Sequence, residues 1–232
     1  RMPSRARPPT GSAILPTRRE ERPHVPLVMP RPELPERDPA CPFCPGNEDQ
    51  TPPEILREPP GPDWQVRVVP NMYAALSGEG TATRTGEPMF REMPGIGSHE
   101  VVIETPRHDG RMDEMSREEV AGVVRVWRER YRALIARPDV RAVIVFKNFG
   151  TLAGTSLTHP HSQIVATPVF LPRLLRRLDV ATRYFDEHGV CVYDELIEAE
   201  RRAAVRMVDE VGGVVAGSAT SPTRLSTTSP TS

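Results

Sequence analysis

Residues 142–167 read AVIVFKNFGTLAGTSLTHPHSQIVAT, and this stretch decides the fold that the sequence predicts. The β-branched run at 141–147 predicts a buried strand, and residues 163–167 predict a second one. Between them, residues 148–156 are small and polar, so their backbone N–H groups could approach an anion closely. The stretch therefore predicts two strands joined by an anion-binding loop.

The end of that stretch carries two histidines and a glutamine at alternate positions, His159, His161 and Gln163. In an extended segment side chains alternate between two faces, so these three should line one surface. A neutral imidazole can attack phosphorus through a ring nitrogen, and the glutamine amide can donate to a phosphoryl oxygen. A simpler interpretation, that two histidines in a turn are a surface accident, stays open because such a pair alone is a weak motif.

The rest of the chain mixes strands and helices without a strict βαβ order. Ser116 and Glu119 have the spacing of a capping box, which opens a helix whose apolar residues recur every three or four positions. The expected helices are 116–136, 171–187 and 193–211, the expected strands are 65–69, 100–105, 141–147 and 163–167, and residues 77–98 are expected to form a loop. This layout predicts the α+β class, with a mixed or antiparallel sheet and flanking helices.

Composition and charge exclude several classes of protein. The 232 residues suffice for one large domain, and the net charge of −1 offers no field for nucleic acid or anionic lipid. No run approaches the ~18 apolar residues of a membrane span. Three cysteines are too few to stabilise a secreted fold of this size by disulfide bonds. A reduced, cytoplasmic protein with no nucleic-acid or membrane partner is expected.

The two ends of the chain differ from its middle. Seventeen of the 27 prolines lie at or before Pro62, so the N-terminal quarter should be extended chain that wraps the rest. Ten of the 16 residues at 217–232 are serine or threonine, a composition that cannot make a core and predicts disorder.

Cys41 and Cys44 form a C-x-x-C loop, which can bind a tetrahedral metal such as zinc from one side. The sequence has no second such pair, so the remaining ligands should be histidines at strand–loop junctions, His108 and His159. One competing interpretation is a redox dithiol, which needs a helix that starts at the first cysteine, and Pro45-Gly46 prevents one. The other is a chance pair of cysteines. Cys191 is expected in the core, and His24, His99 and His188 are expected on the surface or in structural roles.

Four motifs in order resemble galactose-1-phosphate uridylyltransferase, a branch of the histidine triad superfamily. They are CPFCPGNE at 41–48, VVPNMYAAL at 68–76, SHEVVIETPRHD at 98–109 and FKNFGTLAGTSLTHPHSQI at 146–164. The last block is highly specific, and the similarity extends over residues 8–215.

The resemblance implies a ping-pong nucleotidyl transfer with a structural zinc. His161, the second histidine of the H-P-H-x-Q motif, would attack the α-phosphorus of UDP-glucose, and the covalent uridylyl-His161 would pass its group to galactose 1-phosphate. Gln163 would steady the phosphate. The implied zinc ligands are Cys41, Cys44, His108 and His159, and the implied nucleotide contacts are Asn71, Asn148, Gly154, Ser156 and, in a more variable loop, Gln50.

The chain also departs from the resemblance. Typical members have a second triad-like half, which supplies sugar-phosphate contacts and much of a homodimer interface, whereas the matching here stops near residue 215. We therefore expect a uridylyltransferase domain at 1–170, the start of a truncated second half at 171–216 and a disordered tail at 217–232, with a homodimer only for a full-length protein. The abrupt change of composition suggests a truncation or a reading-frame error as the origin of the tail.

Other functions stay open at this point. A related adenylyltransferase or phosphorylase would use the same nucleophile, His161. Thr158 and Ser162 flank the histidines where members vary, so the preference for hexose and for nucleotide base stays open. A catalytically impaired, zinc-stabilised nucleotide-binding fragment is another alternative. A nucleic-acid-binding zinc module is disfavoured because the sequence has no basic, aromatic-laced patch.

Overall fold

The computed structural model describes residues 34–76, 78, 81–87, 89–150, 153, 155 and 157–217. The chain divides into two compact units, Arg1–Leu171 and Pro172–Ser232, and each is described by itself. Within the described ranges, no helix is both long and apolar enough to cross a membrane. The expected N-terminal wrap falls in part on residues 1–33, and the expected disorder on 218–232, which lie outside those ranges.

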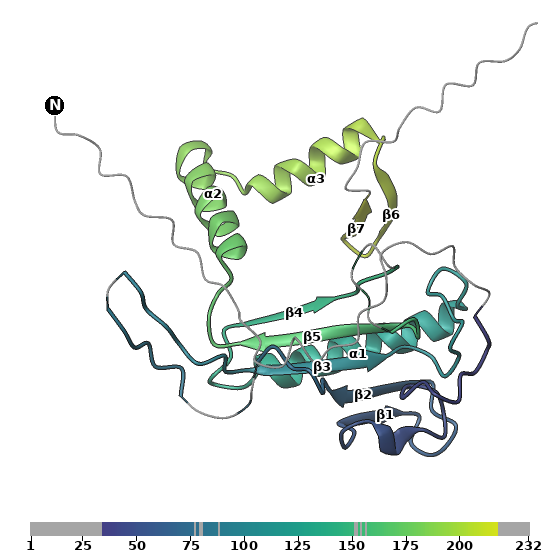
Figure 1. Ribbon diagram of the computed structural model, residues 1–232. Coiled ribbons are helices and arrows are strands. Elements are labelled where there is room, and N and C mark those ends of the chain that lie inside the picture. The colour runs from purple at the N-terminus through teal and green to yellow at the C-terminus, as the bar shows by residue number, and fades with distance from the viewer. Residues whose placement is uncertain are drawn as a thin grey trace, which may run out of the picture. The chain divides into compact units, whose positions relative to one another are not determined.

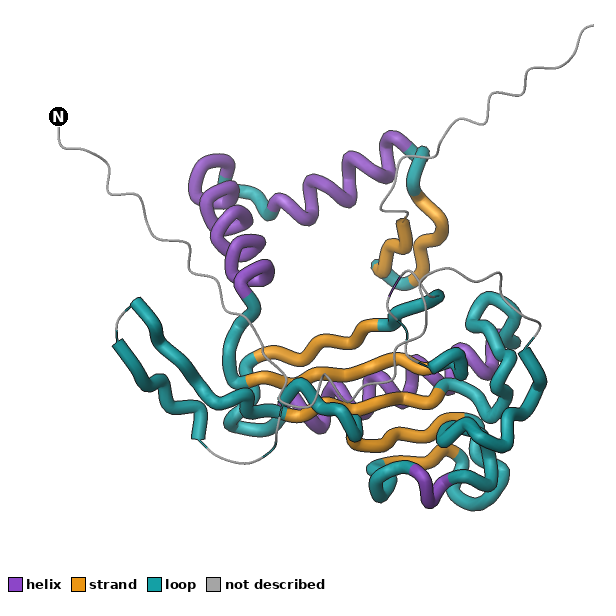
Figure 2. Tube along the Cα trace, in the orientation of Figure 1, coloured by secondary structure: helices purple, strands orange, loops and turns teal. Residues whose placement is uncertain are grey.

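The first unit is built on a five-stranded antiparallel sheet, drawn in Figures 1 and 2. Its strands are β1 (Leu56–Glu58), β2 (Val66–Pro70), β3 (Ser98–Ile103), β4 (Ala142–Phe146) and β5 (His161–Thr167), in the spatial order β1-β2-β3-β5-β4. The described residues of this unit also form a short 3-10 helix, η2 (Glu48–Gln50), and the helix α1 (Arg117–Ile135). The predicted α+β class is confirmed, and in this unit the three-residue strand β1 and the short helix η2 have no counterpart in the prediction.

The two faces of the sheet have different neighbours. Because side chains alternate along a strand, Val102 and Ile164 point to one face, where they pack with Val123 and Val126 of α1. Figure 1 shows α1 against the sheet, running roughly along the direction of the strands. The opposite face carries a second apolar cluster, made of Cys41, Phe43, Cys44, Trp64, Val69, Val101 and Ile103. A helix therefore covers one face, and the loop with the C-x-x-C motif covers part of the other.

Helix α1 begins where the sequence predicts, and an ion pair ties it to the sheet. The Ser116 hydroxyl accepts from the Glu119 N–H (3.2 Å), and the Glu119 carboxylate accepts from the Ser116 N–H (2.7 Å). Further along, the Arg130 guanidinium donates two hydrogen bonds, of 2.7 and 2.9 Å, to the buried carboxylate of Glu100 in β3. The cap thus starts the helix, and the ion pair fixes it against β3.

The second unit contains two helices and a hairpin, and it corrects two predictions. Helices α2 (Pro172–His188) and α3 (Val192–Ala203) precede the antiparallel pair β6 (Met207–Val211) and β7 (Val214–Gly217). The predicted helix at 193–211 is wrong beyond Ala203, because Ala204 adopts a left-handed φ of 51° and ends it. Gly212 and Gly213, with φ of 58° and 81°, then form the turn of a two-residue hairpin. Cys191 is half-buried at the N-cap of α3 rather than in a core.

Candidate functional site

Most of the predicted site residues gather on the sheet face opposite α1. His161 and Gln163 in β5 stand opposite Ile103 and Val101 of β3, and both are buried. Asn71 directly follows β2, and its backbone N–H donates to the carbonyl oxygen of His99 in β3 (2.8 Å). Three neighbouring strands therefore bring together side chains that lie far apart in the sequence.

Four buried side chains form a cluster that could hold a metal ion. The ligand atoms of Cys41, Cys44, His108 and His159 all lie within 4.8 Å of one another. His159 Nδ1 is 3.8 Å from Cys41 Sγ and 3.6 Å from Cys44 Sγ, and His108 Nδ1 is 3.6 Å from Cys44 Sγ. Zn–S bonds of ~2.3 Å and Zn–N bonds of ~2.05 Å at tetrahedral angles give an S···N distance of about 3.6 Å. The cluster therefore has the donor set and the size of a tetrahedral zinc site.

Both histidines of the cluster turn Nδ1 toward the sulfurs, because Nε2 is bonded elsewhere. His159 Nε2–H donates to the carbonyl oxygen of Thr105 (2.8 Å), which leaves the lone pair on Nδ1. His108 Nε2 lies 3.0 Å from the hydroxyl of Thr158. Such outer hydrogen bonds fix the ring orientation of metal-binding histidines. Thr158, which the sequence analysis connected with substrate preference, thus contacts a cluster residue.

Burial favours the neutral forms of Cys41 and His159 when no cation is near. It raises the pKa of the Cys41 thiol to about 12 and lowers the pKa of His159 to about 4, because a charge removed from water is costly. At neutral pH His159 is therefore the neutral imidazole that a metal requires. A bound cation would reverse the effect on the thiols, since the thiolate is the form that binds metal.

His161 begins β5 two residues after the cluster. Its Nδ1–H donates to the carbonyl oxygen of His159 (2.8 Å), so the lone pair of the neutral ring lies on Nε2. The ring of Phe43 packs edge-on against the His159 and His161 rings, at centroid distances of 6.0 and 5.5 Å. The C-x-x-C loop thus orients both imidazoles.

The only lysine of the chain supports the same backbone. Lys147 Nζ forms an ion pair with the buried carboxylate of Glu104 and lies 3.5 Å from the carbonyl oxygen of His161. Lys147 directly follows β4 and Glu104 directly follows β3, so the pair joins the ends of two strands beside the start of β5. The sequence analysis assigned a role to neither residue.

The other predicted nucleotide contacts lie in different surroundings. Asn148 is half-buried just beyond β4, and its carbonyl oxygen accepts from the Thr155 hydroxyl (3.1 Å). Gln50 is exposed at the end of η2. Gly154 and Ser156 lie outside the described residues.

Ser162 points away from this face. Its hydroxyl accepts from the indole N–H of Trp127 in α1 (2.7 Å), and the side chain is fully buried. Ser162 therefore connects the sheet to the helix, and its position between the two site residues of β5 follows from strand alternation.

The residues that form this site also match a known family. The family model for the N-terminal domain of galactose-1-phosphate uridyl transferase matches residues 6–170. The chain belongs to this family. The resemblance inferred from the four motifs is thereby confirmed.

Two curated members show how far the similarity to the uridyl transferase family extends. ADP-glucose phosphorylase from Arabidopsis thaliana is 36% identical over 164 residues, which are 69% of this chain and 47% of that protein. Galactose-1-phosphate uridylyltransferase from Haemophilus influenzae is 31% identical over 181 residues, which are 77% of this chain and 49% of that protein. The chain thus spans about half the length of these relatives.

Solved structures of the uridyl transferase family share the fold. An ADP-glucose phosphorylase from Arabidopsis thaliana with bound ADP-glucose superimposes with a TM-score of 0.65 at 32% identity, over 80% of this chain and 56% of that one. A uridylyltransferase gives a TM-score of 0.61 at 30% identity, over 81% of this chain and 56% of that one.

One residue of this site was missed by sequence reasoning. His99 was expected on the surface or in a structural role, yet its Nε2 lies 2.8 Å from Gln163 Oε1. The available signal was strand alternation: His99 has the parity of Val101 and Ile103, which face the site. Alternation shows only which face His99 shares with Val101 and Ile103. That Gln163 lies beside it follows from the pairing of β3 with β5, which the sequence alone does not give.

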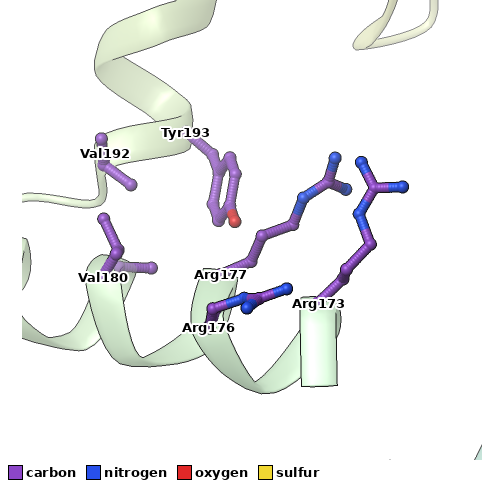
Figure 3. Close-up of a pocket in the computed structure, with 7 residues that line it drawn as sticks. Arg173, Arg176, Arg177, Val180, Val192 and Tyr193 are labelled. Atoms are coloured by element: carbon purple, nitrogen blue, oxygen red, sulfur yellow. The ribbon is translucent and has the colours of Figure 1, made fainter. Parts of the chain in front are cut away.

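A separate pocket in the second unit contains none of these residues. Side chains of α2 and α3 line it, and Figure 3 shows three arginines of α2 near Tyr193 of α3. Its lining residues are Arg173, Arg176, Arg177, Val180, Ala181, Val192 and Tyr193.

Proposed function

We propose that the protein is a nucleotidyltransferase that moves a nucleoside monophosphate group from a nucleotide sugar through a covalent intermediate on His161. The observation that carries this proposal is the tautomer of His161, whose Nδ1–H donates to the His159 carbonyl and whose lone pair is on Nε2. A neutral imidazole held in this way is a nucleophile at pH 7 without a further base. Membership of the uridyl transferase family supports the same chemistry.

The proposed reaction has two steps that balance. In the first, His161 Nε2 bonds to the α-phosphorus of the nucleotide sugar, the bond from phosphorus to the bridging oxygen breaks, and the sugar 1-phosphate leaves. In the second, a phosphate oxygen of the acceptor attacks the same phosphorus, and the N–P bond breaks to restore the neutral ring. The His159 carbonyl holds the Nδ1 proton throughout and stabilises the positive charge that the ring gains when its lone pair is used.

We propose zinc as the metal of the Cys41, Cys44, His108 and His159 cluster, because the S···N distances fit its tetrahedral geometry. Bound there, zinc would supply a structural cross-link between the C-x-x-C loop and the start of β5. His159, Pro160 and His161 are consecutive, so what fixes His159 also restricts the position of the nucleophile.

Two nucleotide sugars are candidate donors. UDP-glucose, with galactose 1-phosphate as acceptor, follows from the family and from the uridylyltransferase relatives. ADP-glucose, with inorganic phosphate as acceptor, is favoured by the 36% identity to ADP-glucose phosphorylase. Both donors pass through the same intermediate on His161 and differ in the group that it carries.

The test is intact-protein mass spectrometry after incubation with UDP-glucose or ADP-glucose, at a pH that preserves the acid-labile N–P bond. We expect one uridylyl or one adenylyl group on the wild type, with an equal amount of glucose 1-phosphate released. His188→Leu, which removes an exposed histidine of α2, should label like the wild type. Nucleotide binding without an adduct from either donor would contradict the proposal and favour a binding fragment without turnover.

A further inference from the structure

We propose that His99 is a positioning residue, which holds the side-chain amide of Gln163 with its NH2 group toward the transferred phosphoryl group. This inference rests on the proposed function, since it concerns how the site stabilises the phosphate that His161 attacks. It assigns a role to a histidine that is nine residues from the nearest predicted metal ligand in the sequence. His99 lies close to Gln163 because β3 pairs with β5.

The tautomer of His99 follows from its backbone contact. The N–H of Ala75 donates to His99 Nδ1 (3.1 Å), so that nitrogen carries the lone pair. The proton of the neutral ring is therefore on Nε2, which lies 2.8 Å from Gln163 Oε1. Of the two ends of the Gln163 amide, only the oxygen can accept a hydrogen bond from His99 Nε2–H. This hydrogen bond therefore determines that Oε1, and not the NH2 group, faces His99.

Asn71 contributes a second donor to the same oxygen. Its own Oδ1 accepts from the N–H of Tyr73 (2.9 Å), which turns its NH2 group toward Gln163 Oε1 (3.4 Å). The same nitrogen lies 3.1 Å from His99 Nε2, so the two donors approach Oε1 side by side. The carbonyl end of the Gln163 amide is thus held by two residues from outside β5.

The orientation of the nitrogen end follows. Among the described residues, no hydrogen bond uses the amide nitrogen of Gln163. Gln163 and His161 lie two residues apart on β5, so both side chains point to the same face. An amide whose oxygen is held on the β3 side presents two N–H donors toward the position where a phosphate on His161 would lie. Donors that are already oriented lower the barrier more than donors that must reorient.

Two substitutions separate this role from a structural one. In His99→Asn, the amide oxygen can still accept from the Ala75 N–H, but the shorter side chain cannot reach Gln163. In His99→Gln, the amide nitrogen reaches the position of Nε2 and can donate to Gln163 Oε1. The readout is the rate of nucleotidyl transfer to His161 at saturating nucleotide sugar. We expect His99→Asn to be slower by about tenfold or more and His99→Gln to remain within about threefold of the wild type, as for one hydrogen bond in the transition state.

A double-mutant cycle tests whether His99 acts through Gln163. If it does, the variant with both His99→Asn and Gln163→Ala should be no slower than Gln163→Ala alone. Rates that fall by the product of the two single effects would overturn the proposal, as would normal labelling in His99→Asn. Absence of labelling in the wild type would instead overturn the proposed function, so the two failures are distinguishable.

A second measurement does not depend on turnover. Long-range 1H–15N spectra of the wild-type chain report the protonated nitrogen of each imidazole, and the His99 signals are assigned by comparison with His99→Gln. We expect the proton of His99 on Nε2 at neutral pH. A proton on Nδ1 would overturn the proposal, because Nε2 could then not donate to Gln163.

Discussion

His159, His161 and His99 differ in how each ring bonds the backbone, either in the nitrogen used or in whether that nitrogen donates or accepts. His159 donates through Nε2 to Thr105, and so presents the lone pair of Nδ1 to the sulfurs. His161 donates through Nδ1 to His159, and so carries its lone pair on Nε2. His99 accepts at Nδ1 from Ala75, and so donates through Nε2. In each case a backbone group sets the tautomer, and the tautomer sets the chemistry available to the other nitrogen.

The sequence predicted a chemical role for two of these three histidines. The roles of His159 and His161 were predicted from the H-P-H-x-Q motif and from the spacing of possible metal ligands, both of which are visible in one dimension. The contact of His99 arises from the pairing of β3 with β5, which brings residue 99 close to residue 163. No spacing in the sequence encodes that distance, so the residue received a structural interpretation.

Loss of one cluster thiol should lower both the metal content and the stability of the fold. Cys44 is fully buried and lies 3.6 Å from both histidines of the cluster, so Cys44→Ser should remove the metal and lower the free energy of unfolding by about 3 kcal/mol. Metal content by elemental analysis and a thermal melt measure the two effects. Cys191→Ser, at the N-cap of α3 in the second unit, is the control and should change neither. Unchanged zinc content in Cys44→Ser would show that the metal site is elsewhere.

The sequence predicted both ends of helix α1 to within one residue, and the reason is local. Ser116 and Glu119 form both bonds of the capping box, which depend on residues three positions apart. The predicted helix at 193–211 failed for the converse reason. Its apolar residues are compatible with a helix, but the left-handed Ala204 and the turn at Gly212-Gly213 divide it into a helix and a strand. The Gly-Gly pair between two apolar runs was a hairpin signal that the periodicity concealed.

The cap of α1 should be visible as a stability contribution. Ser116→Ala removes the acceptor for the Glu119 N–H and should lower the free energy of unfolding by about 1 kcal/mol. Urea unfolding of the variant against the wild type measures the difference. Thr81→Ala, at an exposed loop position, is a matched loss of a hydroxyl that should have little effect. Equal stability of Ser116→Ala and the wild type would mean that the cap does not start the helix.

The same cap predicts a dependence on pH. The backbone N–H and hydroxyl of Ser116 lower the pKa of Glu119, so the folded state binds its proton more weakly than the unfolded chain does. The stabilisation is therefore complete above the ordinary glutamate pKa of about 4.3 and is lost as pH falls below it. Urea unfolding of Glu119→Gln should differ from the wild type at pH 7, and the difference should shrink in acid. Glu118→Gln is the control, and a difference that grows in acid would contradict the assignment.

Trp127 and Ser162 join α1 to the sheet. Ser162→Ala leaves the indole N–H of the partly buried Trp127 without its partner, which should cost about 1 kcal/mol of stability. The choice between UDP-glucose and ADP-glucose should not change, because the hydroxyl faces the helix. A changed ratio of the two labelling rates would show that Ser162 does act at the site.

At the scale of the whole molecule, the described site residues all belong to the first unit. The four cluster residues, His99, His161 and Gln163 lie within Arg1–Leu171, and the described residues of α2 and α3 contribute no buried side chain. We propose accordingly that the nucleotidyltransferase domain occupies residues 1–170 and that the helices after it begin a separate unit. The sequence indicated where the similarity to the family ends, near residue 215. The order of the strands in the sheet depends on pairings between residues far apart in the chain, which no local pattern encodes.

A chain that ends at Leu171 tests this division. It should retain one equivalent of zinc and the affinity for the nucleotide, because every described ligand and every site residue of the sheet remains. Elemental analysis and calorimetric titration with the preferred nucleotide provide the comparison with the 232-residue chain. Loss of the metal on shortening would contradict an independent first unit.

The central claim is that His161 carries the transferred nucleotidyl group, and the most direct measurement is the position and linkage of that group. Peptide mapping of the labelled wild type, with 31P and 15N spectra of the modified peptide, identifies both. The account predicts one group, on His161, joined through Nε2, and none in His161→Gly. A group on another residue, a linkage through Nδ1, or undiminished labelling of His161→Gly would contradict it.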